Sequence, residues 1–191
     1  MDATRTRILE AAIELYIERG ISATTMREIG QRADVAAGTL RNHFPSRAEL
    51  DAAMVERLEA EAQLPKTSIF DGARSIEERL RVLTHAAGRF FVDAARMYRM
   101  WLREPMLGEP WSSAGRRWGA RWEQLMRLAL GPLADDPDAM GVIRAVLQPP
   151  FFEGVAAGSK STSETADLVA DVVAPWFASR LAALGPRGAT G

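Results

Sequence analysis

The stretch from Thr24 to Phe44 constrains the fold of this chain more than any other part of it. Thr25 can cap a helix, because Glu28 lies three residues later and can bond back to the N–H of Thr25, which is the capping-box pattern. One apolar seam continues through the whole stretch and is formed by Ile29, Ala33, Val35 and Leu40. The spacing therefore predicts two short helices joined by a tight turn at a steep angle. Such a helix-turn-helix leaves the outer face of its second helix free to enter a DNA groove.

Apolar residues recur at helical spacing through the rest of the chain, and no segment has a regular strand pattern. We therefore expect an all-α fold with about nine helices, the first three of which form the helix-turn-helix module. Residues 1–5 are expected to form a short polar arm. Outside the helix-turn-helix stretch, helices are expected near residues 6–19, 47–64, 75–92, 93–104, 112–130, 138–147 (resuming over 151–157) and 161–184.

The composition is that of a globular protein, with 47% hydrophobic and 26% charged residues. No apolar run approaches the roughly 20 residues that cross a bilayer, and the N-terminus lacks the apolar region of a signal peptide. The absence of cysteine excludes disulfides and thiolate metal sites. We expect a soluble, cytoplasmic protein with no membrane partner.

The net charge of −1 argues against nucleic-acid binding, but the distribution of charge favours it. Glu10, Glu14 and Glu18 share one face of the first predicted helix and can point away from DNA. Between residues 24 and 47, four arginines oppose two acids, and local potential rather than net charge drives binding. Only two of the 24 cationic residues are lysines, so phosphate contacts are expected to come mostly from guanidinium groups.

An all-helical enzyme is the alternative class, but the chain offers no reactive constellation. It has two distant histidines and no HExxH, phosphate-loop or G-x-S-x-G motif. Neither His43 nor His85 has a glutamate three residues before it, so the ligand spacing of di-iron bundles is missing as well. We therefore expect no catalytic residues, no metal site and no cofactor.

The N-terminal motifs resemble those of the TetR family of bacterial transcriptional regulators, whose founding member is the tetracycline repressor. The resemblance covers residues 5–51 and is carried by Ala23-Thr24-Thr25-x-x-x-Ile29 and Gly38-Thr39-Leu40-x-x-His43-Phe44-Pro45-Ser46-Arg47-x-Glu49-Leu50. It implies an obligate homodimer associated with the bacterial nucleoid, usually a repressor that a small-molecule effector releases from a double-stranded DNA operator. It also implies a DNA-binding domain over residues 1–51 and a ligand-binding and dimerisation domain over 52–185, and we expect residues 186–191 to form a disordered tail.

The sequence departs from the family pattern at the start of the second helix. Ala36-Ala37 stands where the family commonly has Ser-Lys, so one lysine contact with phosphate is missing. Arg41 stands where a tyrosine is common. The guanidinium group of Arg41 can bind a phosphate or hydrogen-bond to O6 and N7 of a guanine, and the sequence does not decide between these two roles. Asp34 stands where glycine is usual and is a candidate cap for the second helix.

The resemblance and the residue chemistry together give a set of DNA-contact candidates. Gly38 lets the backbone approach DNA closely, and Thr39 offers a backbone N–H and a hydroxyl to phosphate. Arg47, at the start of a helix, is expected to point at phosphate together with the free N–H groups there. The full set is Thr25, Arg27, Ala37, Gly38, Thr39, Arg41, Asn42, His43 and Arg47. For Arg27 and Asn42 the alternative is an exposed side chain without a contact.

Large apolar side chains are concentrated between residues 90 and 122, which suggests a cavity for an apolar or aromatic ligand. The candidates for lining it are Phe90, Phe91, Met97, Trp101, Trp118 and Trp122. Aromatic stripes at helical spacing also form ordinary cores, and the sequence does not decide between a lined cavity and a filled core.

The last predicted helix carries more apolar surface than a one-sided surface helix needs. With the preceding helix it is a candidate for a four-helix interface between two copies, and burial within one protomer is the alternative. The interface candidates are Val169, Val173, Trp176 and Phe177.

These features predict a ligand-responsive, dimeric DNA-binding regulator. We expect a repressor that a small apolar or aromatic molecule releases from a palindromic operator. The alternative is a TetR-like protein that has lost operator binding and acts as a ligand- or protein-binding module. The sequence does not specify the effector, the operator, the regulated genes or the sign of regulation.

Overall fold

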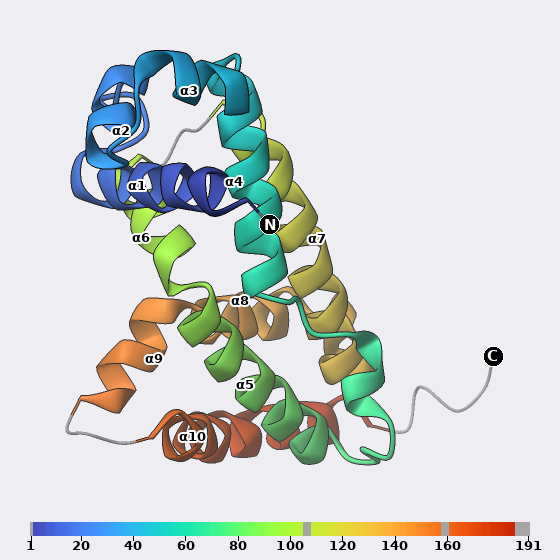
Figure 1. The fold of residues 1–191 in the computed structure, drawn as a ribbon. Helices are drawn as coiled ribbons and strands as arrows, with labels where there is room; N and C mark the ends of the chain where they lie inside the picture. The colour runs from blue at the N-terminus through green and yellow to red at the C-terminus, as the bar shows by residue number, and fades with distance from the viewer. Residues whose placement is uncertain (1, 105–107, 158–160, 186–191) are drawn as a thin grey trace. The chain divides into compact units, whose positions relative to one another are not determined.

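The computed structural model describes residues 2–104, 108–157 and 161–185, and all regular structure in them is helical (Figure 1). The all-α prediction is confirmed, with ten α-helices in this part of the chain where about nine were expected. The α-helices are α1 (Ala3–Arg19), α2 (Met26–Arg32), α3 (Ala37–His43), α4 (Arg47–Glu61), α5 (Ile76–Asp93), α6 (Ala95–Arg103), α7 (Trp111–Leu130), α8 (Pro137–Val146), α9 (Pro149–Ala156) and α10 (Thr162–Ala183). Two short 3₁₀ turns, η1 (Thr67–Phe70) and η2 (Gly131–Asp135), complete the set. The expected disordered tail lies outside the described residues.

Local capping explains where several helices begin. The boxes at Thr25 and Ser161 are complete, with the cap side chain and the glutamate three residues later satisfying each other's backbone N–H groups. Helix α1 begins earlier than predicted, at Ala3, because the Asp2 side chain accepts a hydrogen bond from the N–H of Thr4. The expected polar arm over residues 1–5 is therefore mostly helix. Pro149 occupies the first turn of α9, where its missing N–H costs nothing, so residues 149–156 form a separate helix.

Contacts divide the chain into two compact units. One comprises residues 1–63 and 93–118, and the other comprises residues 64–92 and 119–191. The first unit contains α1 to α4 together with α6 and the start of α7. The domain boundary predicted between residues 51 and 52 falls inside α4, and the functional division into DNA-binding and ligand-binding domains remains a prediction.

The first unit is built around α1. Its core contains the fully buried Ile8, Leu9, Ile13, Tyr16, Ile29, Leu50 and Met54. Leu40 of α3 is buried beside Gly30 of α2, where an added Cβ would lie 3.4 Å from Leu40 Cδ2. The predicted apolar seam through the helix-turn-helix is therefore a real contact between α2 and α3, and a small residue allows their close approach.

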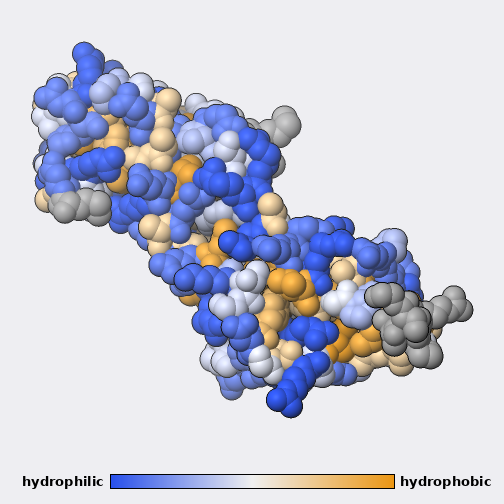
Figure 2. All heavy atoms as spheres, turned by 90° about the vertical axis from the view of Figure 1, so that its right-hand side faces the viewer, coloured by the Kyte–Doolittle hydropathy of each residue, from blue (hydrophilic) through white to orange (hydrophobic). Residues whose placement is uncertain are grey.

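The second unit has its own core, formed mainly by α5, α7, α8 and α10. It includes Leu80, Leu83, Leu125, Ala129, Leu133, Ile143, Val169, Val173 and Phe177. None of the helices in the described residues is long and apolar enough to cross a membrane. On the face shown in Figure 2, hydrophilic residues predominate and hydrophobic ones form patches between them.

Three of the four residues predicted for the dimer interface belong to this protomer core. Val169, Val173 and Phe177 are buried, whereas the large hydrophobic side chains exposed on α10 are Leu168, Val172 and Trp176. Adjacent residues of a helix point about 100° apart. The exposed apolar stripe therefore contains Leu168 and Val172 in place of the predicted Val169 and Val173. Of the predicted set, only Trp176 is exposed, at 39%.

Two adjacent valines test this division of α10. Val173→Ala should lower the free energy of unfolding by about 2 kcal/mol, because it removes two buried methyl groups and leaves a cavity. Val172→Ala makes the same chemical change at a side chain that is 63% exposed, and should cost about 0.5 kcal/mol or less within the protomer. Urea unfolding at a series of protein concentrations separates protomer burial from contact with a second copy. Equal losses at low concentration would contradict the assignment.

Candidate nucleic-acid interface

The turn between α2 and α3 is closed by backbone hydrogen bonds. The N–H of Val35 donates to the carbonyl of Gly30 at 3.0 Å, and the N–H of Asp34 donates to that of Gln31 at 3.2 Å. Asp34 has a φ of 51°, in the left-handed region that favours glycine. Asp34 therefore forms the turn and does not cap α3. The cap position is Ala36, which makes no side-chain hydrogen bond.

Helix α3 presents its outer face to solvent. Leu40 and the following Phe44 are buried against the rest of the unit. The predicted contact residues Ala37, Gly38, Thr39, Arg41 and Asn42 are all exposed. An added Cβ at Gly38 would meet no atom of the protein within 4 Å, so packing inside the chain does not explain the glycine.

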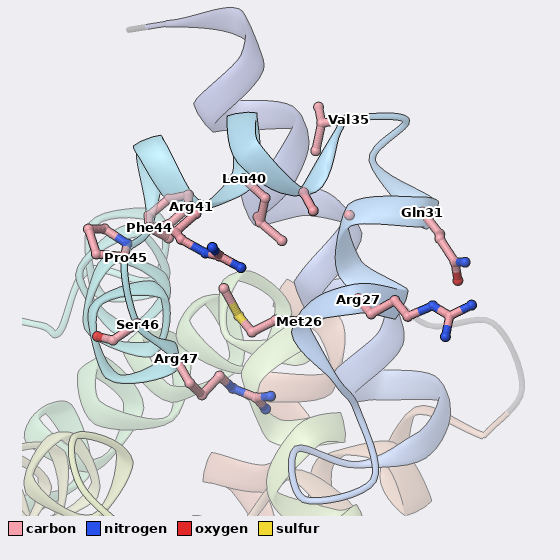
Figure 3. A pocket seen from close by; sticks show the side chains of 12 residues that line it. Met26, Arg27, Gln31, Val35, Leu40, Arg41, Phe44, Pro45, Ser46 and Arg47 are labelled. Carbon is pink, nitrogen blue, oxygen red and sulfur yellow. The ribbon is translucent and has the colours of Figure 1, made fainter.

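A half-open hollow of about 380 Å³ lies between α2, α3 and the start of α4 (Figure 3). Its apolar side is formed by residues such as Met26, Leu40 and Phe44. Arg41 extends from α3 over the hollow toward Met26, whereas Arg27 and Gln31 extend from α2 away from it (Figure 3).

Ion pairing decides which arginines near α3 are available. Arg32 pairs with Glu14 at 3.2 Å and with Glu18 at 2.8 Å, and it lowers the pKa of Glu18 through that hydrogen bond. Arg27 and Arg41 are exposed and make no ion pair among the described residues. Of the four arginines between residues 24 and 47, these two are therefore the ones that no ion pair holds within the described residues.

The acids of α1 are neutralised within the protein. Arg32 of α2 holds Glu14 and Glu18, as described. Glu10 accepts from Arg57 of α4 and from Arg96 of α6, and these bonds lower its pKa against the opposing effect of burial, which is the largest single influence. The acidic face of α1 predicted from the sequence is therefore present, and its three glutamates form ion pairs within the protein.

Arg47 lies differently from the expectation that it points at phosphate. Its Nε donates to Oδ1 of Asp51 at 3.0 Å, and its two terminal nitrogens donate to the carbonyls of Thr24 and Ile21, each at 2.7 Å. The guanidinium also lies 4.6 Å from the ring centroid of Tyr16. Its donors are therefore engaged inside the first unit.

Tyr16 and Asp51 complete this cluster. The Tyr16 hydroxyl donates to Oδ1 of Asp51 at 2.5 Å, and the two residues are 0% and 7% exposed. Burial raises the pKa of Tyr16 well above its usual range, and the negative charge of Asp51 raises it further. Sequence reasoning missed both residues, because Tyr16 reads as part of an apolar stripe and Asp51 as one more surface acid.

Two other predicted contact residues make internal bonds. The Thr25 hydroxyl accepts from the N–H of Glu28 at 3.2 Å as the cap of α2. Nδ1 of His43 lies 3.5 Å from a carboxylate oxygen of Asp2, at the start of α1. Both residues remain candidates for DNA contact, with part of their hydrogen-bonding capacity already used.

The six predicted ligand-binding residues are divided between the two units. Phe90, Phe91 and Trp122 belong to the second unit, where Phe91 packs edge-on against Phe152 with centroids 5.2 Å apart. Met97, Trp101 and Trp118 belong to the first unit. Within it, Trp101 and Trp118 stack edge-on with centroids 5.7 Å apart, and Nε1 of Trp118 donates to Glu59. No group of three or more potential metal ligands occurs in residues 2–104, 108–157 and 161–185.

The buried tyrosine gives the unit a defined response to alkaline pH. A group whose pKa is raised on folding contributes stability that is present below its unfolded pKa, 10.0 for tyrosine, and that is lost as pH rises above it. Tyr16→Phe keeps the ring and should cost about 1–3 kcal/mol below pH 10.0, because Asp51 loses a donor. Its stability should then fall less steeply than that of the wild type above this pH. Urea unfolding across that range measures the difference, and parallel curves would contradict it.

Comparison with known proteins agrees with this geometry. The family described as bacterial regulatory proteins of the tetR family matches residues 8–54. The transcriptional repressor KstR of Rhodococcus jostii is 48% identical over 46 residues, which are 24% of this chain and 22% of the repressor. The transcriptional activator FasR of Mycolicibacterium smegmatis is 29% identical over 109 residues, which are 57% of this chain and 50% of the activator. The chain thus spans half or less of these relatives.

A solved structure extends the likeness in fold to most of the chain. The TetR family transcriptional regulator PfmR of Thermus thermophilus superimposes with a TM-score of 0.64 at 21% identity. The superposition covers 91% of this chain and 96% of PfmR. The family match thus identifies residues 8–54 as the conserved N-terminal region of the tetR family of bacterial regulatory proteins, and over the remainder the likeness is one of helical fold.

Proposed function

We propose that this protein is a DNA-binding transcriptional regulator that acts as a homodimer and represses its target genes. The observation that carries the proposal is the exposed outer face of α3, flanked by the guanidinium groups of Arg27 and Arg41, which form no ion pair among the described residues. An exposed short helix with cationic neighbours is the geometry that helix-turn-helix proteins place in the major groove. Repression is the favoured sign because relatives such as KstR and KstR2 are named repressors, although FasR is named an activator.

Each residue of α3 then has a proposed role. Ala37 and Gly38 allow the backbone to approach the DNA, and Thr39 offers its N–H and hydroxyl to a phosphate. Arg27 binds a phosphate from α2. Arg41 binds either a phosphate or the O6 and N7 edge of a guanine. Asn42 is exposed beside it and can reach a base or a phosphate.

The second unit supports an effector site and a dimer face. Phe91 and Trp122 are only partly buried against the core that includes Phe152, and we place the proposed apolar or aromatic effector beside their rings. The exposed apolar stripe of Leu168, Val172 and Trp176 on α10 is the surface available to a second copy. An effector that changes the spacing of the two reading helices would oppose DNA binding by linkage.

A polarisation assay on labelled duplex DNA flanking the gene of this protein tests the proposal. The wild type should bind this DNA specifically, with an affinity that falls as salt rises. A random-sequence duplex of the same length provides the reference. Binding that is no tighter than to the reference would instead support a TetR-like module that has lost operator binding, as the alanines at positions 36 and 37 allow.

Arg41→Ala, with Arg32→Ala as its matched control, distinguishes the two roles of Arg41. Loss of a phosphate contact should reduce the slope of log affinity against log salt by about 0.9 for any sequence. Loss of a guanine contact should cost about 1–3 kcal/mol on the specific duplex and relax base preference at one position. Arg32→Ala removes a cation already paired with Glu14 and Glu18, and should leave base preference unchanged. Equal effects of the two variants would contradict the proposed division of charge.

A further inference from the structure

The loop between α1 and α2, residues 20–25, is held by side chains from elsewhere in the first unit. Arg47 of α4 donates to the carbonyls of Ile21 and Thr24. Glu104, at the end of α6, accepts from the N–H and the hydroxyl of Ser22, with the N–H bond at 3.0 Å. The loop therefore has fixed partners on both sides immediately before α2 begins.

The Arg47 guanidinium is itself oriented by a buried acid. Asp51 lies one helical turn further along α4 and accepts from Nε, while Tyr16 of α1 donates to the same carboxylate. The planar guanidinium can donate in three fixed directions at once, whereas a lysine ammonium concentrates its donors on one nitrogen. The cluster thus joins α1, the loop and α4 through one side chain.

The position of this cluster matters for DNA reading. Thr24 precedes the cap residue Thr25 of α2, and α2 packs on α3 through Gly30 and Leu40. A shift of the Thr24 carbonyl therefore moves the start of α2 and, through it, the exposed face of α3. In Figure 3 Met26 lies between Arg41 and Arg47, and the Arg47 side chain extends outward from the start of α4.

We infer that Arg47 is a positioning residue for the DNA-reading helix and does not bind phosphate. Together with Asp51 and Tyr16 it sets the orientation of the α2–α3 pair relative to α4. The inference rests on the proposed DNA-binding function. In this inference, Arg47, Asp51 and Tyr16 orient α2 and α3, and Arg27 and residues of α3 contact the DNA.

Asp51→Asn distinguishes the positioning role from phosphate binding, because the two roles predict opposite changes in the affinity for specific DNA. If Arg47 bound phosphate, removal of a nearby negative charge would leave DNA binding unchanged or tighten it. If Arg47 positions α2, the variant should weaken specific binding about tenfold or more, as loss of a charged hydrogen bond predicts. Binding to the random-sequence duplex should be unchanged or slightly tighter. Glu56→Gln is the matched control, because Glu56 is exposed on the same helix and takes no part in the cluster.

Arg47→Lys gives a second, independent comparison. A phosphate contact tolerates lysine, because a point charge suffices. The positioning role requires a guanidinium that donates in three directions, so Arg47→Lys should lose specific affinity. The slope of log affinity against log salt on random-sequence DNA should remain that of the wild type. The double variant with Asp51→Asn should lose little more than either single variant, because both break the same cluster.

Amide hydrogen exchange in the absence of DNA completes the test. Exchange at Glu28 and Ile29, whose N–H groups close the first turn of α2, should be faster in Asp51→Asn than in Glu56→Gln, with helicity and cooperative unfolding retained. If the wild type binds DNA specifically and Asp51→Asn binds equally well, the inference is overturned while the proposed function stands. If the wild type shows no specific binding, the proposed function fails, and unchanged exchange at α2 would overturn the positioning role as well.

Discussion

The Arg47 guanidinium joins α4 to two parts of the first unit that lie more than 20 residues earlier in the sequence, α1 and the loop that follows it. Its charge is balanced by Asp51, and its remaining donors satisfy two carbonyls of the loop. Asp51 is buried, and a buried charge persists only when it is paired and its hydrogen-bonding groups are met, so its pairing with the partly exposed Arg47 favours one position for the loop. Together with the capping box at Thr25 and the contact between Gly30 and Leu40, that position fixes where α2 begins and how α3 packs on it.

Pairing of charge also shapes the candidate DNA surface. A chain with a net charge of −1 can present a cationic surface only if its acids are neutralised elsewhere. Arg32 balances Glu14 and Glu18, and Arg57 with Arg96 balances Glu10. Arg27 and Arg41 are left beside the exposed face of α3. A small number of well-placed guanidinium groups, rather than a broad basic patch, is therefore what the proposed interface offers to DNA.

Features that depend on neighbouring residues could be predicted from the sequence. The capping box at Thr25 and the seam from Ile29 to Leu40 each involve side chains within a few residues or turns, and both are present. The choice of face on α10 could not be predicted in the same way. Val172 and Val173 are equally apolar, and only the packing of α5, α8 and α10 decides which of them enters the core.

The sequence by itself determined the helical class, the helix-turn-helix and the exposed residues of α3, because local periodicity and caps encode them. The tertiary structure alone decided which charges are free and which are used internally. Arg41 and Arg47 look equivalent in the sequence, six residues apart in a cationic stretch. The difference arises because Tyr16 and Asp51 converge on Arg47 from α1 and α4, whereas no acid reaches Arg41 among the described residues. Electrostatic pairing between distant segments depends on distance in space, and sequence order does not record it.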